Sequence, residues 1–152
     1  MKTVRRTLLL VAVLLLGFVL GAYLFSNTRP RTFVAIRNCE GNCLRPDELS
    51  GLVASVGIAK FSKLLPGIVK ETDKTIVLEQ QASAPHVHYV VIPKHDIKNI
   101  GDLAESDRDY LLDSFYVMSE LVREKKLTEY QISSNGPGYQ TVTYLHFHLT
   151  GR

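Results

Sequence analysis

Hydrophobic residues form one long continuous run near the N-terminus, followed by shorter periodic stretches. Residues 7–25 are uncharged and rich in leucine and valine, and they follow the cations Lys2, Arg5 and Arg6. A helix of that length spans about 28 Å, close to the thickness of a bilayer's hydrocarbon core. The run lacks a small-x-small cleavage pattern. We therefore expect residues 1–25 to hold an uncleaved, single-pass membrane anchor, with a cleaved signal peptide as the alternative.

Residues 26–64 are predicted to contain a polar linker and then a helix. Pro46 suits a first helical position, and Asp47 and Glu48 suit the positive end of a helix. An apolar stripe follows at helical spacing, and we expect it to pack against the rest of the domain. The stripe consists of Leu49, Leu52, Val53 and Val56.

Beyond residue 65, short stretches typical of strands accompany one strong helical pattern. The helix is predicted over residues 106–125, where apolar positions recur every three or four residues. Strands are predicted over 67–71, 75–79, 86–92, 129–133 and 140–149. Short connections favour antiparallel pairing. The pattern predicts an α+β fold, an antiparallel sheet with packing helices, preceded by one transmembrane helix.

The net charge of +3 comes entirely from the N-terminal cations, so the remainder of the chain is neutral. A nucleic-acid-binding domain usually carries a basic surplus. We therefore expect no nucleic-acid partner, although a pocket for a small anion remains compatible with this charge.

The only two cysteines, Cys39 and Cys43, lie four positions apart. Their spacing suits a small disulfide loop in an oxidising compartment, and two free thiols are the alternative. The N-terminal basic cluster favours an internal N-terminus. Together these features favour a membrane protein whose domain is extracytoplasmic.

The last predicted strand carries two histidines at alternate positions. In a strand, Tyr144, His146 and His148 share one face, and a glycine-rich loop at residues 135–138 comes shortly before them. Two convergent imidazoles suit either a metal site or chemistry on phosphate. A metal-binding domain would draw on His86, His88, His146 and His148.

Three segments together resemble the histidine triad (HIT) superfamily. Residues 84–94, Ala-Pro-His-Val-His-Tyr-Val-Val-Ile-Pro-Lys, resemble its strand of the form AP-x-H-φ-L-V-I-P-K. Residues 134–142 resemble its glycine-rich loop. Residues 144–149 resemble the His-φ-His-φ-His-φ-φ signature, with Tyr144 in place of the first histidine. The order and spacing of the segments identify residues 65–152 as a HIT-like domain.

HIT proteins are nucleotide hydrolases and transferases that act at the α-phosphorus through a nucleotidyl-histidine intermediate. The resemblance implies that His146 is the nucleophile and that His148 and His88 act beside it. It implies no metal and no cofactor, and a homodimer formed through the 106–125 helix. It also implies nucleotide or phosphate contacts from Glu79, Asn135, Gly138, Gln140, Thr141 and Tyr144.

Tyr144 departs from the family pattern, because a phenol cannot become a cation at neutral pH. We expect an enzyme of the phosphoramidate or dinucleoside polyphosphate class. A non-catalytic nucleotide-binding module at the membrane is the alternative.

Overall fold

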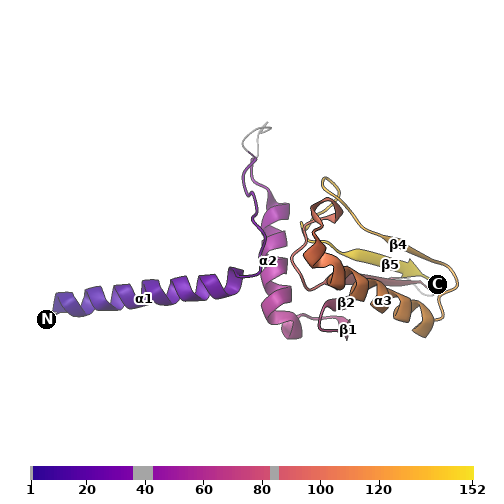
Figure 1. The fold of residues 1–152 in the computed structure, drawn as a ribbon, viewed down its shortest axis with the longest axis horizontal. Coiled ribbons are helices and arrows are strands. Elements are labelled where there is room, and N and C mark those ends of the chain that lie inside the picture. The colour runs from indigo at the N-terminus through magenta and orange to yellow at the C-terminus, as the bar shows by residue number, and fades with distance from the viewer. Residues whose placement is uncertain (1, 36–42, 83–85) are drawn as a thin grey trace.

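In the computed structural model, a long N-terminal helix precedes one antiparallel sheet that packs against two further helices (Figure 1). The described residues are 2–35, 43–82 and 86–152. The helices are α1 (Lys2–Phe25), α2 (Pro46–Phe61) and α3 (Arg108–Glu124), and short 3-10 turns cover Ser62–Leu64, Ile100–Asp102 and Glu105–Asp107. The strands are β1 (Ile68–Glu71), β2 (Thr75–Gln80), β3 (Val87–Pro93), β4 (Tyr130–Ser133) and β5 (Phe147–Gly151). The predicted α+β class is confirmed.

The sheet has the order β1-β2-β3-β5-β4, and every neighbouring pair is antiparallel. The register places His88 of β3 opposite Gln80 of β2 on one side and Thr150 of β5 on the other. It also places Val90 opposite His148. Because alternate side chains of a strand point to opposite faces, His88 and His148 lie on the same face of the sheet.

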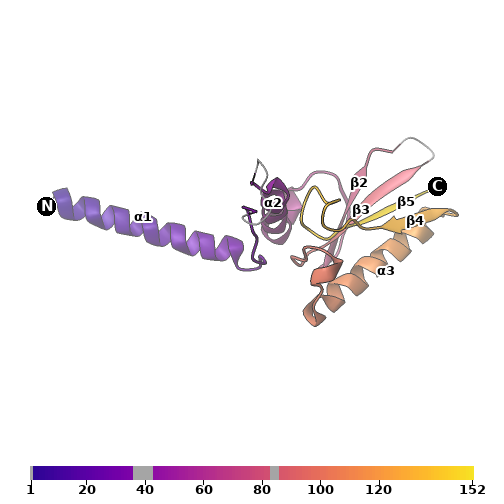
Figure 2. The ribbon, with the colours of Figure 1, turned by 90° about the horizontal axis from the view of Figure 1, so that it is seen from above.

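The two faces of the sheet are covered unequally. Helix α3 covers one face and encloses the larger core, whereas α2 lies across one end of the other face (Figure 2). The histidines lie beyond the part of the sheet that α2 covers, so they remain partly accessible. The larger core contains Val77, Tyr89, Val91, Ile97, Val117, Met118, Leu121, Leu145, Phe147 and Leu149, and the smaller one contains Ile58, Ile76 and Tyr144.

Helix α2 begins at Pro46 as predicted, but the apolar stripe predicted to pack on the domain is only partly right, because Leu52 and Val56 are half-buried whereas its other two residues are exposed. Leu49 and Val53 are 56% and 65% exposed, whereas Gly51 and Ile58 are buried. The reason is a close approach at Gly51, where an added Cβ would lie 2.7 Å from the carbonyl oxygen of Thr143. The position that lets the helix come closest determines its rotation, and this rotation leaves Leu49 and Val53 outside.

The last strand is shorter than predicted, because it begins only at Phe147. The residues before it direct their backbone hydrogen bonds elsewhere. The N–H of Thr143 donates to the carbonyl of Asp47 (3.1 Å), and that of Leu145 donates to the carbonyl of Ile97 (2.6 Å). Contacts with distant segments therefore replace the strand ladder that the alternating sequence predicts.

Two arginines fasten the segment between α1 and α2 to the domain. Arg31, whose side chain is 1% exposed, donates to the carboxylate of Asp96 (2.5 Å) and to the carbonyl of Thr143 (2.6 Å). One guanidinium nitrogen of Arg29 reaches both carboxylate oxygens of Asp107, at 2.7 and 2.8 Å. Removing one partner of a buried pair such as Arg31–Asp96 typically costs about 3–5 kcal/mol. The chain leaving α1 is thus held at a defined place.

The α1 helix is long and apolar enough to cross a membrane from Val4 to Phe25, and none of that span is buried. Cys43 is disulfide-bonded. Cys39 and the Ala84–Pro85 pair of the predicted strand motif lie outside the described residues.

Candidate active site

Three histidines meet at the open face of the sheet. His88 comes from β3, His148 from β5, and His146 lies immediately before β5. His88 Nε2 and His148 Nδ1 are hydrogen-bonded at 2.9 Å. The ring of His146 meets that of His148 edge-on, with 4.9 Å between centroids. The structure therefore brings together the three residues predicted to be catalytic.

The ring of His146 is oriented by the backbone. His146 Nδ1 lies 2.7 Å from the carbonyl oxygen of Tyr144, and a carbonyl oxygen only accepts hydrogen bonds. Nδ1 therefore carries the hydrogen, and the lone pair of the neutral ring is on Nε2. The hydroxyl of Ser134 donates to the carbonyl of His146 (2.8 Å) and holds the same stretch of chain. This arrangement presents a nucleophilic nitrogen.

The His148–His88 pair can transfer a proton. Burial lowers the pKa of His148, and positive charge on His146 or His88 would lower it further. Burial thus favours the uncharged form of His148, and a proton taken up by the pair is shared between the two rings across their hydrogen bond. A pair that carries this extra proton can give it to a leaving group as a general acid, and the pair without it can take up a proton as a general base.

A cavity of about 410 Å³ lies beside His146 and His148, a size within the range of small-ligand pockets. One wall is apolar and comes from α2 and β3, and the other is polar and comes from β2 and the loop after β4. An apolar wall that faces a polar one suits a ligand with a flat ring and an anionic group. The apolar lining residues are Ala54, Ile58, Val90, Ile92 and Val142, and the others are Gln80, Asn135, Tyr139, Thr141, Tyr144, His146 and His148.

Of the residues predicted to contact a nucleotide, Asn135, Thr141 and Tyr144 line this cavity. Gly138 and Gln140 instead line a neighbouring hollow, and the Gln140 amide donates to the carbonyl of Lys98 (3.1 Å). The loop is shaped at Gly138, whose φ of +86° favours glycine.

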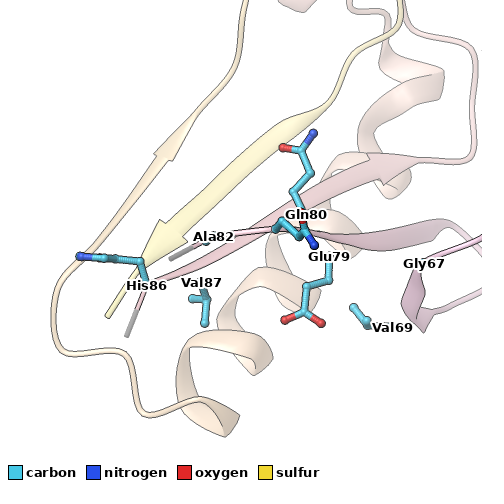
Figure 3. Close-up of a pocket in the computed structure, with 8 residues that line it drawn as sticks. Gly67, Val69, Glu79, Gln80, Ala82, His86 and Val87 are labelled. Carbon is cyan, nitrogen blue, oxygen red and sulfur yellow. The ribbon is translucent and has the colours of Figure 1, made fainter. Parts of the chain in front are cut away.

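Glu79 is not brought to the histidines. It pairs in register with Tyr89, on the face covered by α3, and lines a separate hollow with Gly67 (Figure 3). Its neighbour Gln80 is paired with His88 and lines the cavity of the histidines. Sequence reasoning missed Gln80, although the strict alternation along β2 could have identified it once the pairing with His88 was known.

The hydroxyl of Tyr144 is occupied by the backbone. It bonds to the carbonyl oxygens of Pro93 and His95, each at 2.9 Å, and the residue is 2% exposed. Burial, with the nearby charge of Asp96, raises the pKa of this phenol well above its usual range. The phenol therefore stays neutral and fixes the chain, while the carbonyl of the same residue orients His146.

His86 does not join the other three histidines. His86 lies just before β3, its side chain lines hollows at that end of the strand, and it points away from Glu79 and Val87 (Figure 3). Within residues 2–35, 43–82 and 86–152, no three His, Cys, Asp or Glu side chains are grouped to hold a metal ion. The geometry does not favour the four-histidine metal site.

Comparison with known proteins agrees with this geometry. A family model described as "Scavenger mRNA decapping enzyme C-term binding" matches residues 62–152. An uncharacterized HIT-like protein of Buchnera aphidicola subsp. Acyrthosiphon pisum is 28% identical over 93 residues, which cover 59% of this chain and 82% of the relative. The chain belongs to the HIT superfamily.

Solved HIT structures have the same fold. A HIT family hydrolase from Clostridium thermocellum aligns with a TM-score of 0.55 and 29% identity, over 64% of this chain and 89% of that one. A HIT family hydrolase from Legionella pneumophila Philadelphia 1 aligns with a TM-score of 0.53 and 26% identity, over 60% and 87%. This chain therefore has a HIT hydrolase-like domain.

The HIT match begins after α2, yet α2 contributes part of the cavity. Ala54 and Ile58 line it, and both precede residue 62. Sequence reasoning missed them. The spacing of the small residues Gly51, Ala54 and Ser55 was the available signal, because small side chains on one helix face permit close packing.

Proposed function

We propose that this HIT domain is a nucleotide hydrolase or transferase that acts at the α-phosphorus of a nucleotide conjugate. The observation that supports the proposal most directly is the 2.7 Å contact between His146 Nδ1 and the carbonyl of Tyr144. It leaves Nε2 of that ring free to act as the nucleophilic atom.

In the first step, His146 Nε2 attacks the α-phosphorus, and the bond from phosphorus to the leaving group breaks. The leaving group takes the extra proton carried by the His148–His88 pair, which leaves both rings of the pair neutral. The nucleotidylated ring of His146 is then positively charged, and its Nδ1–H still donates to the carbonyl of Tyr144, which stabilises that charge.

In the second step, the oxygen of a water molecule attacks phosphorus, and the bond from phosphorus to Nε2 breaks. The histidine pair takes up the proton of the water and returns to its starting state. An alcohol or amine in place of water gives the transferase reaction. Thr141 and Asn135 provide polar groups for the phosphate, and Ile58 and Ile92 provide an apolar surface for the base.

The substitution His146→Ala tests this proposal. With an adenosine phosphoramidate or a dinucleoside polyphosphate as substrate, we expect a loss of activity of roughly 1000-fold or more. The control is His86→Ala, which removes a histidine outside the trio and should change activity by less than about threefold. Comparing the two substrates assigns the leaving-group class.

Mass spectrometry provides a second measurement, because the native enzyme quenched in alkali should carry one nucleotidyl group on His146. Equal activity of His146→Ala and the native protein would refute the proposal. Nucleotide-dependent thermal stabilisation with no turnover would instead identify a non-catalytic binding module.

We also propose that α1 is a single-pass anchor with an internal N-terminus, so that the HIT domain is extracytoplasmic. The disulfide at Cys43 supports an oxidising compartment. An alkaline phosphatase fusion at Arg152 should be active, and a reporter that works only in the cytoplasm should be inactive at the same position. The reverse result would place the domain inside the cell.

A further inference from the structure

Helix α2 carries apolar side chains on two opposite faces. The inner face packs on the sheet through Ile58, with Ala54 beside it. The outer face presents Leu49 and Val53, which are more than half exposed. A helix that is apolar all round is normally covered all round. The outer face therefore requires something to cover it.

The outer face is the one that contacts the end of α1. Lys60 Nζ lies 4.4 Å from the centroid of the Tyr23 ring and donates to the hydroxyl of Ser26 (3.2 Å). Val53 and Leu49 precede Lys60 by about two and three helical turns at 3.6 residues per turn. Val53 and Leu49 therefore lie on the same face of α2 as Lys60, the residue that contacts the end of α1.

The two helices lie crosswise to each other (Figures 1 and 2). If α1 crosses a bilayer, α2 lies along the bilayer surface. The buried ion pairs of Arg29 with Asp107 and of Arg31 with Asp96 hold the intervening chain, so α2 cannot swing away freely.

Exposed apolar side chains continue past both ends of α2. Before it, Val34 and Leu44 are paired across an antiparallel bridge, so they lie on the same side of that pair. After it, Phe61 and Leu64 are also exposed. Exposed apolar side chains are thus present beyond both ends of the helix.

We propose that the outer face of α2, defined by Leu49, Val53 and Lys60, lies in the interfacial region of the bilayer that α1 crosses. The occupant is lipid because the face is continuous with the end of an apolar α1 that the protein leaves entirely uncovered. Tyr23 at the end of α1 and Lys60 beside it are side chains that favour the headgroup level. This proposal rests on α1 being a membrane anchor and does not require catalysis.

The position of the active site follows from this placement. Ala54 and Ile58, on the inner face of the same helix, line the cavity of the histidines. The cavity would then lie about one helix diameter, roughly 10 Å, from the lipid.

Tryptophan fluorescence tests the proposal, because the natural chain contains no tryptophan. The full-length variant Val53→Trp is reconstituted into phosphatidylcholine vesicles, with or without bromine atoms on the acyl chains. An interfacial helix lies about 5–10 Å into the boundary between headgroups and acyl chains. We expect blue-shifted emission and a loss of about half the intensity or more in brominated vesicles.

The matched control is Tyr116→Trp, at an exposed position on α3. It should show solvent-like emission and no quenching. Leu49→Trp repeats the measurement about one helical turn earlier in α2, in case Val53→Trp does not fold.

Two results would overturn the proposal. The first is absence of quenching in both α2 variants, with emission equal to that of Tyr116→Trp. The second is blue-shifted, unquenched emission that turns red when the protein is diluted into more lipid, which would identify a second copy of the chain as the cover. Because neither measurement needs turnover, a catalytically inactive protein leaves the test valid.

Discussion

Replacing Gly51 by alanine should destabilise the domain, although alanine is the better helix former. Glycine in a helix interior is typically less favourable than alanine by about 0.5–1 kcal/mol. At Gly51, however, the new Cβ would lie 2.6 Å from Nη1 of Arg31 and 2.7 Å from the carbonyl oxygen of Thr143. Both groups are buried and hydrogen-bonded to each other, so a displacement of either one weakens that hydrogen bond.

The expected cost follows from those contacts. Overpacking of a tight core costs about 1–3 kcal/mol. Displacing Arg31 from the carbonyl of Thr143 removes a hydrogen bond to a charged group, which is worth about 1.5–3 kcal/mol. After subtracting the gain in helix propensity, we expect Gly51→Ala to lower the free energy of unfolding by about 2–4 kcal/mol. For a domain of this size, that corresponds to a Tm lower by roughly 6–12 °C.

The same helix contains a matched control. Gly57 has no atom within 4 Å of an added Cβ, so Gly57→Ala should stabilise the domain by about 0.5–1 kcal/mol. The assay is thermal unfolding of the full-length chain in detergent, followed by the near-ultraviolet circular dichroism of its tyrosines. A Tm for Gly51→Ala equal to or above that of Gly57→Ala would refute the close-packing account of α2.

The activity of Gly51→Ala should also fall. Thr143 directly precedes Tyr144, whose carbonyl orients His146, and a displacement of about 1 Å at a catalytic group can cost about 100-fold in rate. We expect kcat to fall by about 10-fold or more, with KM less affected, whereas Gly57→Ala should retain the native kcat.

Three further predictions concern the site itself. Tyr144→Phe removes the donor to two buried carbonyls and should lower the free energy of unfolding, measured in urea, by about 1–3 kcal/mol. Its kcat should stay within about threefold of the native value, because the carbonyl that orients His146 remains. A large loss of kcat in a folded Tyr144→Phe variant would show that the hydroxyl itself takes part in the reaction. Burial lowers the pKa of His148 in the folded state, so the unfolded state takes up a proton first as the pH falls. The stability that depends on a neutral His148 is present above a pH of about 6.5 and is lost as the pH falls through the folded pKa. Between pH 7 and pH 5, the urea midpoint should therefore drop less in His148→Asn than in the native protein. An equal drop in the two proteins would contradict a lowered pKa of His148. Gly138→Ala places alanine at a φ of +86° and should cost about 1–2 kcal/mol, whereas Gly136→Ala, with open space around its Cβ, should unfold at nearly the native temperature.

Local patterns were sufficient for most elements of the fold. The strands β1 to β4 and the helix α3 lie within a residue or two of the predicted ranges, because β-branched runs and a 3.6-residue period are local signals. The rotation of α2 and the start of β5 could not be predicted in this way. Both depend on contacts of Thr143 with Asp47 and Gly51, nearly a hundred positions away in the chain.

The sequence pointed to the three histidines that the structure brings together, but not to their surroundings. The motifs around His88, His146 and His148 pointed to these residues through their resemblance to the HIT superfamily. Glu79 and Gln80 illustrate the limit, since a shift of one residue in strand register exchanges the two faces of a sheet. Only the pairing of Gln80 with His88 determined which of the two lies at the cavity.

The sequence by itself determined the family, the order of the elements and an N-terminal helix apolar enough to cross a membrane, because periodicity, charge and motif spacing are properties of neighbouring residues. Only the tertiary structure decided that the hydroxyl of Tyr144 is bound by the backbone while its carbonyl orients His146. Only the structure showed that α2 forms part of the cavity with one face and leaves the other exposed. These facts depend on which distant atoms fill the space around each side chain, and no local pattern contains that information.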